Sequence, residues 1–74
     1  MPDAKCEREH LAEANRHIAQ AQKHIANQKK QIEKLERDGH EIDMAVSMLR
    51  ALEHALRAFE RHRNLVLKRI KNHE

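Results

Sequence analysis

Apolar residues recur at alternating steps of three and four residues along two long stretches of the chain, 11–35 and 42–70. This spacing keeps apolar side chains on one side of an α-helix and is typical of helices that pack lengthwise against each other. We call each row of such positions a seam. Two polar residues interrupt the seams, Gln28 in the first and Arg63 in the second. The first seam holds Leu11, Ala14, Ile18, Ala21, Ile25, Gln28, Ile32 and Leu35, and the second holds Ile42, Ala45, Leu49, Leu52, Leu56, Phe59, Arg63, Val66 and Ile70.

The segment between the seams contains the only glycine of the chain. Gly39 can adopt the left-handed backbone conformation that ends a helix and turns the chain. We therefore predict one domain, residues 1–74, with a first helix over about 4–38, a turn over 38–40 and a second helix over about 41–72. A turn this short forces the helices to run antiparallel, and each helix would be roughly 50 Å long. The predicted fold is all-α, a helical hairpin or antiparallel coiled coil.

The two seams can be aligned by pairing their residues outwards from the turn. Large and small residues then often face each other, as close packing requires. Toward the chain ends the alignment becomes more polar, because Ala14 meets Arg63 and Glu7 meets Ile70. We expect the helices to fray at that end.

The second helix carries apolar residues on a second side, which a two-helix hairpin does not need. The corresponding row of the first helix is polar. An uncovered apolar row is typical of a contact surface, to which methionine adapts well. We predict that two copies dimerise through this row into a four-helix bundle. There are two alternatives: a different protein covers this row, or the row is an ordinary solvent-exposed helix surface rich in alanine. The row, called the apolar stripe below, holds Met44, Met48, Ala51, Ala55, Ala58, His62 and Leu65.

Seven histidines are present, and His10, His17 and His24 recur at intervals of seven residues beside the first seam. Successive members lie roughly 10.5 Å apart along a helix, too far to bind one ion together. The alignment places His17 near His62, but two imidazoles without a cysteine or carboxylate make a weak zinc site. We therefore predict no metal site, with His17 and His62 as the only candidate ligands. A further hypothesis is that histidines near the apolar stripe become charged at low pH and weaken the dimer.

Positive charge gathers near the end of the second helix, in a chain whose formal net charge is +3. Such a patch could bind the phosphates of a nucleic acid. The hairpin sets it beside acidic residues that compensate it, and the chain lacks a recognition motif and aromatic residues to stack on bases. Nucleic-acid binding is therefore the alternative to a protein–protein interaction. The basic patch comprises Arg57, Arg61, Lys68, Arg69 and Lys71, and the facing acids are Asp3, Glu7, Glu9 and Glu13.

Composition argues against several other functions. A two-helix ridge with one aromatic residue, Phe59, offers no enclosed pocket, and Cys6 and His10 are close only in sequence. We predict that the protein is not an enzyme and has no cofactor. No apolar run approaches the roughly 20 residues of a membrane span, and a single cysteine cannot form a disulfide within the chain. A cytoplasmic protein without a membrane partner is expected.

Three segments resemble a family of short uncharacterised bacterial helical-hairpin proteins. They are Leu11-Ala-Glu-Ala-Asn-Arg-His-Ile-Ala-Gln20, His24-Ile-Ala26 and Ile32-Glu-Lys-Leu-Glu-Arg-Asp-Gly-His40. The resemblance covers roughly residues 11–70, and its most specific part is the Asp-Gly-His turn. It implies a cytoplasmic helical hairpin and brings no known activity or catalytic residue. The resemblance supports the predicted fold and leaves the biological role open.

Overall fold

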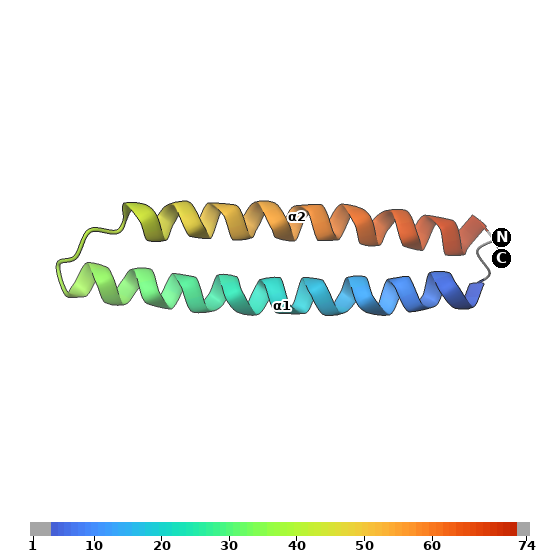
Figure 1. Ribbon diagram of the computed structural model, residues 1–74, viewed down its shortest axis with the longest axis horizontal. Helices are drawn as coiled ribbons and strands as arrows, with labels where there is room; N and C mark the ends of the chain where they lie inside the picture. The colour runs from blue at the N-terminus through green and yellow to red at the C-terminus, as the bar shows by residue number, and fades with distance from the viewer. Residues whose placement is uncertain (1–3, 73–74) are drawn as a thin grey trace.

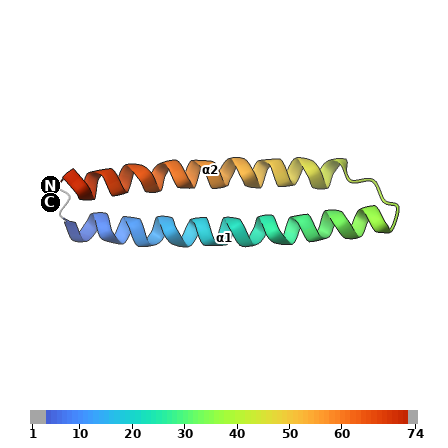
Figure 2. The same cartoon turned by 180° about the vertical axis from the view of Figure 1, so that it is seen from behind.

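Two long antiparallel helices make up the protein (Figure 1). In the computed structural model, which describes residues 4–72, α1 spans Ala4–Arg37 and α2 spans Asp43–Asn72. The hairpin extends 55 × 14 × 14 Å along its principal axes. Both views show the helices side by side along their length, with the start of α1 and the end of α2 at the end opposite the turn (Figure 1 and Figure 2). The predicted all-α helical hairpin is confirmed.

Gly39 ends the first helix in the predicted way. Its φ angle is +74°, in the left-handed region. The amide of His40 donates a 2.9 Å hydrogen bond to the Leu35 carbonyl, and the amide of Gly39 donates one of 3.1 Å to the Glu36 carbonyl. These bonds satisfy carbonyls that a helix end would otherwise leave without partners, and they turn the chain back on itself.

The second helix begins two residues later than predicted, at Asp43. The carbonyl of Ile42 accepts the first helical hydrogen bond, from the amide of Val46 at 2.9 Å. Ile42 therefore caps α2, and Glu41 belongs to the connection. The extra residues are needed because the chain must cross the roughly 8–10 Å between the axes of two packed helices, and seam spacing carries no information about that distance.

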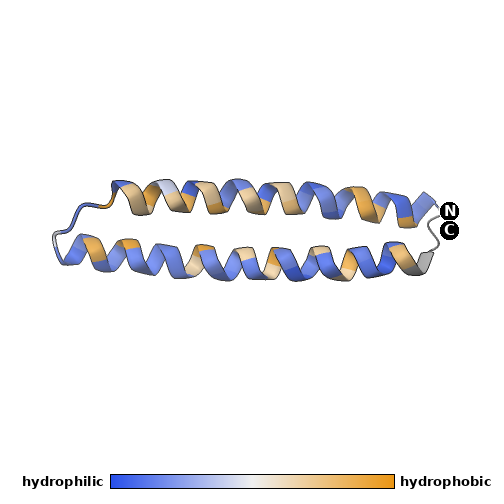
Figure 3. Cartoon of the chain, viewed as in Figure 1, coloured by the Kyte–Doolittle hydropathy of each residue, from blue (hydrophilic) through white to orange (hydrophobic). Residues whose placement is uncertain are grey.

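The seams form the core, and all their positions are buried or half-buried. The two helices contribute unequally, because the buried apolar side chains of α1 are alanines and isoleucines, whereas α2 contributes only Val66 to the buried apolar set. The larger leucines and Phe59 of α2 cover these side chains and stay half-buried themselves. Hydropathy colouring shows α1 blue over most of its surface, while α2 carries more orange and pale segments (Figure 3). The buried apolar residues of α1 are Ala14, Ile18, Ala21, Ile25 and Ile32.

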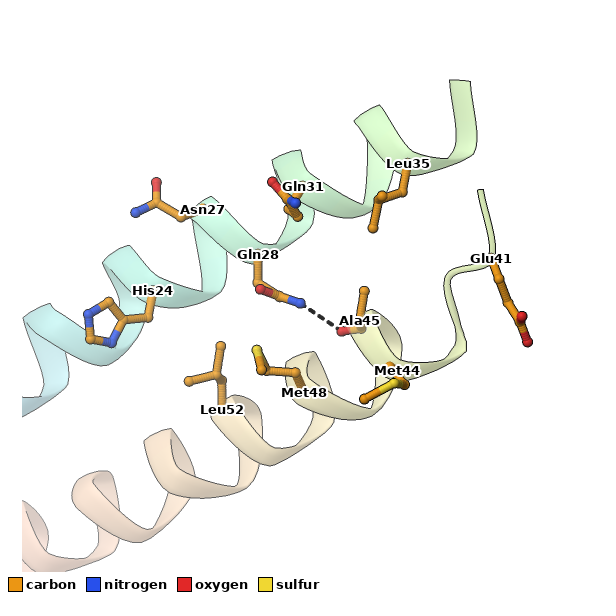
Figure 4. Close-up of a pocket in the computed structure, with 10 residues that line it drawn as sticks. All are labelled: His24, Asn27, Gln28, Gln31, Leu35, Glu41, Met44, Ala45, Met48 and Leu52. Atoms are coloured by element: carbon orange, nitrogen blue, oxygen red, sulfur yellow. Dashed lines mark hydrogen bonds between the residues drawn. The ribbon is translucent and has the colours of Figure 1, made fainter. Parts of the chain in front are cut away.

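Gln28, the polar interruption of the first seam, finds a partner inside the hairpin. Its Nε2 donates a 2.9 Å hydrogen bond to the backbone carbonyl of Ala45 on α2 (Figure 4). A buried amide costs little free energy when it is hydrogen-bonded in this way. The bond also has a direction and a length, so it favours one lengthwise alignment of the two helices over its neighbours.

The open end of the hairpin is packed more tightly than the predicted fraying implies. Val66 is completely buried, Glu7 is 2% exposed, and both helices continue past these residues. Oε2 of Glu7 has no hydrogen-bond partner, and it lies 4.0 Å from Nδ1 of His10, a contact that is an ion pair only when the histidine is protonated. Leaving a buried acceptor without a hydrogen bond costs about 1–3 kcal/mol, so Glu7 destabilises this end of the hairpin.

Candidate interaction surface

The apolar stripe remains open on α2 after the hairpin has formed. Met44 is 88% exposed, Met48 is 58% exposed and Leu65 is 55% exposed. The members between them are exposed as well, except for one half-buried alanine. They are Ala51, Ala55, Ala58 and His62, of which Ala55 is half-buried. The hairpin by itself therefore covers the seam of α2 and leaves its second apolar side in water.

Half-buried seam residues extend this apolar surface. Leu52 and Phe59 line shallow hollows on the same side of the hairpin as Met48 and Ala55. In the hollow nearest the turn, Met48 and Leu52 lie next to each other on α2 (Figure 4). The sequence analysis treated Leu52 and Phe59 only as seam residues that pack against the first helix. Heptad spacing could not reveal their partial exposure, which depends on small residues such as Ala21 on the other helix.

The matching row of α1 is polar and borders the same hollows. His24, Asn27 and Gln31 line the hollow nearest the turn from the α1 side, and Asn27 points away from α2 (Figure 4). All members of the row are exposed, so α1 neither covers nor extends the apolar stripe. The row consists of Glu13, His17, Gln20, His24, Asn27, Gln31 and Lys34.

Charged residues stand at both ends of the stripe. Glu41, just before α2, is exposed and lines the hollow that Met44 and Met48 also line. Arg69 is exposed and follows His62 by seven residues, so it continues the line of the stripe toward the chain end. The sequence interpretation missed Glu41 as an end of the stripe and read Arg69 only as part of the basic patch. Continuation of the same spacing could have found Arg69, whereas Glu41 precedes α2 and is linked to the stripe by the hollow that it lines.

The candidate metal ligands His17 and His62 line one hollow near the open end, together with His10 and Glu13. Their proximity agrees with the predicted helix alignment. The ring of His17 packs at a tilt of 41° against Phe59, with 5.3 Å between the ring centroids. Within the described residues, no group of three or more histidine, cysteine, aspartate or glutamate side chains is placed to hold a metal ion. The contact with Phe59 gives His17 a packing role at the edge of the seam.

All five residues of the basic patch are exposed. Arg57, Arg61 and Lys68 follow a spacing that places them on the outer side of α2, away from α1, and Arg69 lies in line with the stripe. In the part of the chain that the structure describes, none of the five basic residues forms an ion pair. The facing acids therefore compensate the patch only over longer distances, which salt screens. Of these acids, Glu9 and Glu13 are exposed, Glu7 is buried, and Asp3 lies outside the described residues.

Comparison with known proteins finds no match to any protein-family model, curated protein or solved structure. The resemblance to bacterial helical-hairpin proteins therefore stays a prediction. Neither described helix combines the length and the apolar character that crossing a membrane requires. Arguments about function must start from the surface of the hairpin itself.

Proposed function

We propose that this chain is a small coiled-coil interaction or scaffolding module that associates with a second copy of itself through the apolar stripe. The observation that carries the proposal is the exposure of Met44, Met48 and Leu65 on one side of one helix. Contiguous exposed apolar surface in a soluble protein usually marks a contact site. Two hairpins joined in this way would form a four-helix bundle.

The surface area of the hairpin supports the proposal. The chain exposes 6064 Å², whereas a compact monomer of 8.8 kDa exposes about 4800 Å². The excess is larger than the roughly 800 Å² that each partner buries in a standard interface. A chain of this size also gains only about 3–5 kcal/mol from a single core, so a second apolar contact would add usefully to its stability.

A double charge substitution tests this proposal. Met48→Glu with Ala55→Glu places two carboxylates in the stripe, and we expect the mass measured by light scattering to fall from that of a dimer to that of a monomer. The matched control is Ala19→Glu with Ala26→Glu, which places two carboxylates at the same spacing at exposed positions of α1 outside the hollows that border the stripe. This control should remain a dimer. A parent protein that is monomeric at high concentration, or a stripe variant of unchanged mass, would rule the proposal out.

Nucleic-acid binding is the rival function, and the exposure of the basic patch without ion pairs favours it. It predicts binding to duplex DNA that weakens steeply with added salt. Substituting Arg57, Arg61 and Lys68 together by glutamine should then abolish the binding. Binding that persists in this triple variant would contradict the assigned patch, and a parent protein that does not bind at low salt would remove the rival.

The proposal also includes a reducing, cytoplasmic setting and no catalytic role. The setting is supported by the single cysteine, which cannot form a disulfide within the chain. Catalysis usually requires a water-excluding pocket with convergent groups. The hollows along the hairpin are shallow, which supports a contact surface more than a reaction site.

A further inference from the structure

We infer that the two copies pack their α2 helices antiparallel, with Ala55 of one copy against the partner's Ala55. This inference rests on the proposed self-association and adds the direction, the alignment and the number of copies. It is carried by the order of large, small and charged residues along the stripe.

Side-chain size along the stripe is nearly symmetric about Ala55. Alanines flank the centre on both sides, and long side chains follow toward both ends. In an antiparallel pairing, alanines meet alanines where the two helices cross most closely, and long side chains meet each other where the helices diverge. Size alone also permits a parallel pairing, in which each residue meets its own copy. The antiparallel pairs are Ala51 with the partner's Ala58, Met48 with the partner's His62, and Met44 with the partner's Leu65.

Charge selects the antiparallel direction. The stripe lies between Glu41 and Arg69, so an antiparallel pairing about Ala55 sets Glu41 opposite the partner's Arg69 at both ends. A parallel pairing sets the two Arg69 side chains against each other. The contrast extends along the whole segment, since residues 41–54 hold three acidic and one basic residue while residues 56–69 hold one acidic and five basic residues. Opposed like charges disfavour the parallel pairing, and opposite charges favour the antiparallel one.

The symmetry of this pairing also limits the assembly to two copies. A two-fold axis that passes between the Ala55 residues uses the same surface on both hairpins, so the interface closes on itself. The polar row of α1 leaves no comparable apolar surface for adding a third copy. The structure thus assigns a closed dimer.

Single-cysteine variants test the direction. They are made with Cys6→Ser, and each pair is unfolded and refolded together so that copies exchange. Ala55→Cys should form a disulfide-linked dimer, because the facing backbones are close enough for the bond. Met48→Cys should not link to itself but should link to His62→Cys when the two are mixed, and mass spectrometry identifies the mixed product.

Charge reversal gives an independent measure. Glu41→Lys should weaken the dimer about 2- to 10-fold, because it opposes a basic residue at both ends, and adding Arg69→Glu should restore the affinity. In a parallel dimer neither reversal creates a new like-charge contact, so Glu41→Lys would leave the affinity unchanged. The dissociation constant can be measured by sedimentation equilibrium.

The outcomes separate this inference from the proposed function. Self-linking of Met48→Cys, or a Glu41→Lys variant of unchanged affinity, would overturn the antiparallel direction while leaving self-association in place. Light scattering could show a dimer in which none of the cysteines at positions 48, 55 and 62 cross-links. That result would overturn the alignment on the stripe. A parent protein that is monomeric would instead overturn the proposed function.

Discussion

The two helices contain seams of the same spacing but differ in what they leave exposed. α1 buries the alanines and isoleucines of its seam and exposes histidine, glutamine and charged residues to water. α2 covers the seam of α1 with leucines that stay half-buried, and it carries the apolar stripe on a second side. Hairpin formation therefore buries the apolar seam of α1 and leaves apolar surface of α2 exposed to water. The difference teaches that one helix of a pair can bury its apolar residues within the hairpin while the other keeps apolar surface exposed to water.

The largest expected effect comes from truncating a buried residue in the seam of α1. Ile25→Ala should lower the free energy of unfolding by about 2–5 kcal/mol, because it opens a cavity in the core. Leu52→Ala, at the aligned position of α2, should cost less in dilute monomer, since Leu52 is half-buried. Urea denaturation followed by circular dichroism measures both. Equal losses would show that the two seams are buried alike and would refute the comparison.

Replacing the buried or half-buried polar residues of α1 by leucine should stabilise the protein. Glu7→Leu should raise the free energy of unfolding by about 1–3 kcal/mol, because it removes a buried carboxylate oxygen that lacks a hydrogen bond. Gln28→Leu is the matched control, and its gain should be smaller because it removes a satisfied amide. The same denaturation experiment at neutral pH measures the two. A destabilised Glu7→Leu protein would contradict the burial assigned to this side chain.

The connection between the helices should be sensitive to one substitution. Gly39→Ala should lower the free energy of unfolding by about 1–2 kcal/mol, because an alanine side chain is strained at the observed φ of +74°. There is open space around the glycine, so the loss would come from backbone conformation and not from a clash. His40→Ala, at the next and equally exposed residue, should have little effect. Similar losses in both variants would mean that the turn does not depend on the left-handed glycine.

The smallest expected effect is a weaker dimer at about pH 5 than at about pH 8. His62 belongs to the stripe, and His10, His17 and Glu13 of α1 line the same hollow, so charge on these imidazoles would fall within or beside the contact surface. Sedimentation of the parent and of His62→Gln measures the effect. A parent dimer of equal affinity at both pH values would dismiss the hypothesis.

The fold could be predicted because its signals are local. Alternating steps of three and four identify the helices, and a single glycine between them marks the turn. The start of α2 could not be predicted, because it depends on how far the chain must travel between the helices. The burial of Glu7 was also missed, since the exposure of a polar residue depends on how the opposite helix packs over it.

Part of the candidate surface could likewise be predicted from the sequence, and part required the structure. The members of the apolar stripe could be named from spacing alone, whereas the contribution of Leu52 and Phe59 required the packed hairpin. Glu41 was recognised as an end of the stripe only when it was seen to line the same hollow as the methionines. A charged residue gives no apolar signal by which a periodic pattern could include it.

The order of residues is sufficient to specify two antiparallel helices, the seam between them and the direction of each side chain around its own helix. These properties depend on the helical repeat and on the conformational freedom of one glycine, which are local. Packing decided which seam residues are buried, where a carboxylate oxygen is buried without a hydrogen bond and how far the apolar surface of α2 extends. The physical reason is that exposure is set by the size of the side chains on the opposite helix and the distance between the helix axes.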